Sequence, residues 1–174
     1  RRWLRLSARL GRLDLYRNAA GDLVALSQAT LFNDLVRLPI DLDEYGTLVR
    51  APVWTGSFPN GQPNSMDCNG WTSPAAMVDV GASSGGPTRW TTGYTGPEAI
   101  SCGGLARIYC LSRASSTPGT PATIPTGAKI AYVTAQTTGA NGGRASLDTW
   151  CNLGSNKPVG FTSRTFVAFV STTS

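Results

Sequence analysis

The residues best suited by type to bind a ligand lie in the stretch WTGSFPNGQPNSMDCNGW, residues 54–71. Gln62 and Asn64 carry amide oxygens, which are hard ligands of the kind that a calcium-dependent sugar site uses. Asp67 is near them, but no second Glu-Asn or Asn-Asp pair, which such a site would also need, follows before SCGGLARIYC. The two tryptophans and the cysteine of the same stretch are typical of a disulfide-tied core. The pattern therefore favours a turn leading into a disulfide frame over a calcium site, and Gln62 and Asn64 stay candidates for a ligand loop.

Catalytic groups are sparse along the chain. It contains no histidine, so a serine or cysteine nucleophile lacks its usual base, and a zinc site built on histidine is excluded. The acids Asp41, Asp43 and Glu44 cluster in DLDEYG, where their alternation is more typical of surface charge on an exposed strand than of a glycosidase pair. We expect no enzyme activity, no metal and no cofactor.

Aromatic side chains provide a second class of candidate. The chain has five tryptophans, and Trp71 and Trp150 lie close to cysteines, which favours core packing. Trp90, within GGPTRWTTGYTG, is the best candidate for an exposed ligand contact. The sequence thus predicts a possible ligand loop at Trp90.

The first helix expected from the sequence is basic and amphipathic. In RRWLRLSARLGRLDLYR an apolar stripe lies beside a row of arginines, and the whole chain has a net charge of +5. Such a helix either packs its stripe on the core with a solvated basic face or binds a polyanion. The candidate polyanion-binding residues are Arg1, Arg2, Arg5, Arg9, Arg12 and Arg17.

The composition and the sequence patterns predict the fold that positions these residues. The chain has 174 residues, 41% of them hydrophobic and 14% charged, with 20 glycines and 11 prolines. No apolar run approaches the roughly 20 residues of a membrane span. We predict a single loop-rich domain with no membrane span. The elements expected are a strand and short helix in 23–35, an exposed strand in 38–46, a strand in 128–135, a helix in 145–154 with Ser146 as N-cap, and a closing strand in 165–172.

The chain divides at a change of composition. Residues 112–127, SRASSTPGTPATIPTG, are almost all Ser, Thr, Pro and Gly, and read as an extended linker. Residues 1–111, the main body, precede it, and residues 128–174, the C-terminal segment, follow it. This segment is small for independent folding, so we expect it to pack on another part of the protein.

The cysteines are four: Cys68, Cys102, Cys110 and Cys151. Without a CxxC pair and without histidine, they fit two disulfides better than a zinc or redox site, with buried thiols as the alternative. Disulfides are typical of oxidising compartments, so we expect an extracellular or cell-surface protein.

Together the runs VWTGSFPNG, CNGW and SCGGLARIYC resemble the C-terminal half of an endostatin-like domain, a disulfide-bonded variant of the C-type-lectin fold. The C-terminal segment resembles the beginning of the same domain, so the order is rotated. The resemblance implies an α+β, C-type-lectin-like fold with a loop-rich mixed sheet and short helices. It also implies the pairs Cys68–Cys102 and Cys110–Cys151.

Two arrangements satisfy the rotated order. The C-terminal segment either folds back on its own chain as a circular permutant or completes a neighbouring copy, which would build a head-to-tail filament or a tandem array. We expect a non-enzymatic structural module whose partners are other copies of itself. The alternative is an adhesive module that binds an extracellular glycan or polyanion through the Arg-rich helix or the Trp90 loop. Neither predicts a nucleic-acid partner.

Overall fold

The computed structural model describes residues 15–33, 35–93, 99–112, 128–139 and 142–172. Arg1, Arg2, Arg5, Arg9 and Arg12, and with them most of the predicted polyanion patch, lie outside these ranges. So does nearly all of the predicted linker. No helix within the described ranges is long and apolar enough to cross a membrane.

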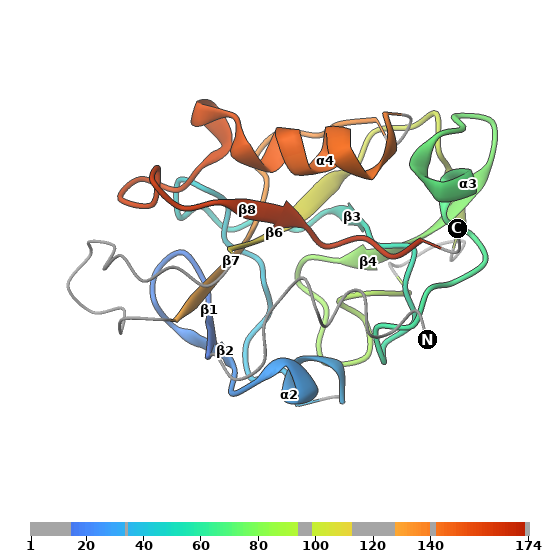
Figure 1. Cartoon of the computed structure of the whole chain (residues 1–174). Helices are drawn as coiled ribbons and strands as arrows, with labels where there is room; N and C mark the ends of the chain where they lie inside the picture. The colour runs from blue at the N-terminus through green and yellow to red at the C-terminus, as the bar shows by residue number, and fades with distance from the viewer. Residues whose placement is uncertain (1–14, 34, 94–98, 113–127, 140–141, 173–174) are drawn as a thin grey trace.

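One mixed sheet forms the centre of the described structure (Figure 1). Its order is β2-β1-β7-β6-β3-β4-β5, and β8 also pairs with β6. β1 pairs in parallel with β7, and β3 with β6, while the other pairs are antiparallel. The strands are β1 Tyr16–Arg17, β2 Leu23–Ala25, β3 Pro52–Trp54, β4 Met77–Ala82, β5 Ala99–Ser101, β6 Arg107–Ser112, β7 Lys129–Val133 and β8 Phe166–Ala168.

Short helices cover both faces of this sheet. In Figure 1, α4 lies on one side of the central strands and α2 on the other. The helices are α2 Gln28–Phe32, α3 Cys68–Trp71, α4 Gly143–Asn152 and the short 3₁₀ helix η1 Gly154–Asn156. The chain is therefore an α+β structure with a mostly sheet core, as the sequence predicted at that level.

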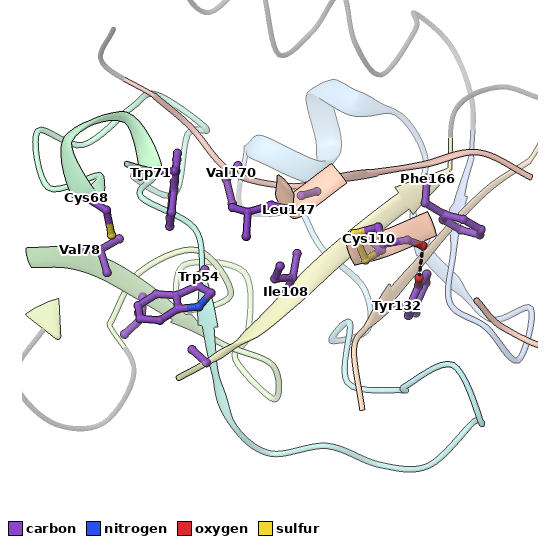
Figure 2. Packing of buried hydrophobic residues seen from close by; sticks show 14 of the residues in the cluster. Trp54, Cys68, Trp71, Val78, Ile108, Cys110, Tyr132, Leu147, Phe166 and Val170 are labelled. Carbon is purple, nitrogen blue, oxygen red and sulfur yellow. Dashed lines mark hydrogen bonds between the residues drawn. A yellow bond between two sulfur atoms is a disulfide. The ribbon is translucent and has the colours of Figure 1, made fainter. Parts of the chain in front are cut away.

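The central strands are buried on both faces. Along β6, Ile108 and Cys110 face one hydrophobic cluster, and Tyr109 and Leu111 face the other. Because successive side chains of a strand point to opposite faces, a strand between two covered faces must be apolar at nearly every position. The first cluster, drawn in Figure 2, also contains Leu147 of α4, and the second contains residues of α2.

The elements expected in the second half of the chain are present with shifted limits. β7 and β8 fall within the predicted strands, and α4 begins at Gly143, two residues before the predicted helix. Gly142 occupies the N-cap position, so the assignment of Ser146 as the cap was wrong. In the first half, β2 and α2 match the predicted strand and helix, and Ser27 caps α2 by accepting a hydrogen bond from the Thr30 N–H.

A left-handed turn at α3 lies beside the first disulfide. Cys68, Asn69 and Trp71 have φ angles of 57°, 54° and 67°. This conformation costs a residue other than glycine roughly 1–2 kcal/mol, so neighbouring contacts must hold it. The Asp67 carboxylate caps the turn by accepting from the Gly70 N–H at 3.0 Å, and Cys68 is tied to Cys102.

Candidate functional site

The boundary between the main body and the C-terminal segment runs through the central sheet. At Cys110, β6 pairs with Tyr132 of β7 along one edge and with Ala168 of β8 along the other. Both neighbours belong to the C-terminal segment. Without it, this half of β6 would have unpaired backbone groups on both edges, which is unfavourable for a buried strand.

The segment also completes both hydrophobic clusters. It supplies Tyr132, Leu147 and Phe166 to the first cluster and Val167 and Phe169 to the second. Each of these side chains is at most 3% exposed. The main body and the segment therefore share one core.

Two buried tryptophans of the main body hold the segment through hydrogen bonds. The Trp54 Nε1–H donates to the Thr138 carbonyl at 2.7 Å, and the Trp71 Nε1–H donates to the Ser171 carbonyl at 2.7 Å. The Ser171 N–H in turn donates to the Thr55 carbonyl. Sequence reasoning assigned both tryptophans to the core, which is where they lie (Figure 2), but had no signal for their hydrogen-bond partners.

Two charged residues of the main body hold the residues that follow β7. The Ala135 N–H donates to Glu44 Oε2 at 2.7 Å, and Arg107 Nη1 donates to the Thr134 carbonyl at 2.7 Å. Burial raises the pKa of Glu44, against a smaller opposing effect from its hydrogen bonds and from Arg107. Glu44 is 2% exposed and Asp43 is 4% exposed. The prediction that these acids are surface charge on an exposed strand was wrong.

Asp43 has a structural task in the same turn. Its Oδ1 accepts hydrogen bonds from the N–H groups of Tyr45 and Thr47, at 2.9 and 2.8 Å. A carboxylate that bonds backbone two and four residues later fixes a turn, as aspartate commonly does. This turn brings Glu44 to Ala135, and Tyr45 OH donates to the Ser155 carbonyl. The acids therefore shape the boundary.

Each of the four cysteines is bonded. Cys68 pairs with Cys102 inside the main body, and Cys110 pairs with Cys151 across the boundary. These are the pairs that the resemblance implied. Cys110 lies in β6 and Cys151 in α4, so the second bond attaches the helix of the C-terminal segment to the central strand.

The structure places Gln62 and Asn64 of the predicted ligand loop in different environments. Gln62 is exposed, whereas Asn64 is buried at 6% exposure. The Asn64 Nδ2–H donates to Asp79 Oδ2 at 2.8 Å, and Thr92 Oγ1 donates to the same oxygen. The two amides thus do not converge on one ligand. Within the described ranges, no group of three or more His, Cys, Asp or Glu side chains could hold a metal ion.

The predicted exposure of Trp90 was also wrong. Its side chain has no exposed surface and packs against Phe32, Phe169 and Tyr109, with ring centroids 6.0, 4.8 and 5.7 Å away. The polar residues around it in the sequence suggested exposure, but they lie in turns and bends while the ring itself is buried. Trp90 cannot stack on a ligand in this state.

One residue of the predicted polyanion patch, Arg17, lies in the described part of the chain. Its guanidinium donates to the Gly21 carbonyl at 2.6 Å and is half-buried. It therefore stabilises the turn after β1.

No family model, no curated protein and no solved structure matches this chain.

Proposed function

We propose that this chain is an extracellular, non-enzymatic structural module that assembles head to tail, with the C-terminal segment of one copy completing the main body of the next. The described structure is the closed form, in which the segment packs on its own chain. An exchanged form would reproduce the same contacts between copies. Exchange of an identical element is a low-cost route to assembly, because the contacts of the closed form are formed again between copies.

The observation that carries the proposal is the length of the connection between β6 and β7. These antiparallel neighbours place Leu111 opposite Ala131, and the Ile130 N–H donates to Ser112 Oγ at 2.8 Å. Such strand ends can be joined by about 2–5 residues. The chain uses residues 113–127, which when extended would span roughly 50 Å. That reach exceeds the about 40 Å diameter expected of a body this size.

The fold supports the same proposal at a finer level. Three features agree with an endostatin-like variant of the C-type-lectin fold in rotated order. They are the pairing of the two disulfides, the packing of a helix on a loop-rich sheet, and the two buried tryptophans, Trp54 and Trp71, at the boundary. In that rotated order the C-terminal segment corresponds to the start of the domain. A segment that belongs at the start of such a domain is well suited to complete another copy.

Isotope mixing tests the proposal. Chains labelled with ¹⁵N and unlabelled chains are mixed in reducing denaturant, refolded with oxidation, and digested without reduction. Exchange predicts peptides in which Cys110 of one isotope is bonded to Cys151 of the other, in multimers that reduction dissociates. Cys68–Cys102 is the internal control, because it lies within the main body and should stay within one isotope. If the Cys110–Cys151 peptides are also of one isotope throughout, the proposal is wrong.

A further inference from the structure

An open hollow lies between the end of α2 and the turn formed by residues 58–62. It has a volume of about 570 Å³ and is lined by Phe32, Asn33, Phe58, Pro59 and Asn60. Sites for small ligands usually have about 300–1,000 Å³, with apolar walls and a few polar groups. None of these described lining residues is ionisable. The hollow therefore combines aromatic surface with neutral amides.

The turn that forms one wall is held firmly by its own backbone. The Phe58 N–H donates to the Gln62 carbonyl and the Gly61 N–H to the Phe58 carbonyl, both at 2.9 Å. Pro59 fixes its own φ at the second position of the turn. Gly61 has φ +75°, and a Cβ there would lie 2.6 Å from the Phe32 ring. Only glycine lets the turn rest directly on that ring.

The floor of the hollow is equally well supported. The Phe32 ring is 3% exposed and packs against Phe169 and Trp90, with centroids 5.6 and 6.0 Å away. Phe58 differs from these rings, because 46% of its side chain is exposed. The turn and the floor fix the backbone from which Phe58 projects. An aromatic ring exposed on a fixed turn is available as a stacking surface.

We propose that this hollow binds a neutral saccharide without a metal ion. The apolar C–H face of a sugar ring would stack on Phe58, and its hydroxyls would exchange hydrogen bonds with the exposed amides of Asn33 and Asn60. The Asn60 Oδ1 also accepts the Gln62 N–H at 3.0 Å, which orients this amide. A polyanion is less well suited, since none of the described residues that line the hollow is cationic. The described lining residues all belong to the main body, and the Phe169 ring behind Phe32 would be present in the closed and the exchanged form alike, so the site does not depend on segment exchange.

Titration of the full ¹⁵N-labelled chain with neutral oligosaccharides tests this site. The probes are the hexasaccharides of cellulose, laminarin and chitin, each up to about 10 mM, which would detect dissociation constants in the millimolar range. We expect at least one probe to shift the amide resonances of Asn33, Phe58, Asn60 and Gly61 in a saturable way, equally with calcium and with a chelator. The absence of saturable shifts with all three probes would overturn the proposal, as would a requirement for calcium.

Substitutions of Phe58 connect any binding to the hollow. Phe58→Ala should weaken binding by about tenfold or more, whereas Phe58→Tyr, which keeps the ring, should retain it. Leu105→Ala is the matched control, because Leu105 is 66% exposed and does not line the hollow. Unchanged affinity in Phe58→Ala would show that the saccharide binds elsewhere and would overturn the assignment.

Discussion

Glu44 is the residue through which pH acts most directly on the boundary. Its carboxylate is 2% exposed, accepts the Ala135 N–H, and faces Asp43 and Arg107. Burial is the largest effect and raises its pKa above the ordinary value of 4.5. The folded state therefore binds the Glu44 proton more tightly than the unfolded state does. The stability that this proton contributes is fully present below pH 4.5 and is lost as pH rises through the raised pKa.

Glu44→Gln tests this effect, because the amide oxygen can still accept the Ala135 N–H but does not titrate. We expect the free energy of unfolding of Glu44→Gln, relative to the parent, to increase from pH 4.5 toward pH 7, by an amount within the about 0.5–3 kcal/mol usual for single substitutions. Urea unfolding across this pH range measures it. Burial also raises the pKa of Asp41, so only the difference between the two proteins isolates Glu44. A difference that does not change with pH would contradict the prediction.

Individual side chains were harder to place from sequence than their types suggested. Asp41 and Asp43 alternate with apolar residues, as surface acids do, and Glu44 follows them directly. The fold nevertheless buries Asp43 and Glu44 at the boundary. Trp90 lies among small polar residues, which usually surround exposed positions, but three rings enclose it. Asn64 has the chemistry of a ligand and instead bonds Asp79. For Glu44, Trp90 and Asn64 the deciding partner is not a near neighbour in the sequence and leaves no local signal.

At the scale of elements, the two disulfides have different tasks. Cys110–Cys151 joins β6 to α4 across the boundary, whereas Cys68–Cys102 holds the left-handed turn of α3 inside the main body. They close stretches of similar length, with sequence separations of 41 and 34. Loop-closure entropy therefore gives each a similar contribution, about 4 kcal/mol at most. Removal of either disulfide should therefore lower the free energy of unfolding by a similar amount, but should loosen a different part of the protein.

We therefore compare Cys110→Ala/Cys151→Ala with Cys68→Ala/Cys102→Ala. Each double variant should lose about 2–4 kcal/mol in urea unfolding. Hydrogen exchange of the native proteins should separate them. The first variant should lose protection of the β8 amides of Val167 and Ala168, and the second should not. Equal protection of β8 in both variants would show that the boundary does not open separately from the main body.

Periodic segments were predicted better than their limits. β7 and β8 are clear in the sequence, because their runs of β-branched and aromatic residues suit a strand buried on both faces. The start of α4 was missed, because Gly142 caps it without a side-chain hydrogen bond, whereas Ser146 had the expected residue type. Two partners of β6, the strands β7 and β8, could not be predicted from local sequence, since they lie beyond the linker.

For the whole molecule, the closed and exchanged forms share every contact of the boundary, so they differ mainly in the connection between β6 and β7. A short connection would favour closure, because these strands are antiparallel neighbours in one sheet. The present connection permits both forms, and the balance between them then depends on protein concentration and on the loss of translational freedom upon association. In the proposed assembly, linker length is thus the variable that separates a closed monomer from a chain of modules.

Shortening the linker tests this argument, because it leaves the residues of the hydrophobic core unchanged. We replace residues 113–127 with a five-residue turn rich in Asn and Gly, which reaches roughly 17 Å and cannot span from one body to the next. The shortened chain should keep the thermal midpoint of the closed form and remain monomeric at concentrations where the parent forms multimers, as measured by sedimentation velocity. A matched variant with a scrambled linker of the same length should assemble as the parent does, because reach and composition are retained. If the shortened chain assembles like the parent, exchange of the C-terminal segment is not the mechanism, since the segment would then be confined to its own body.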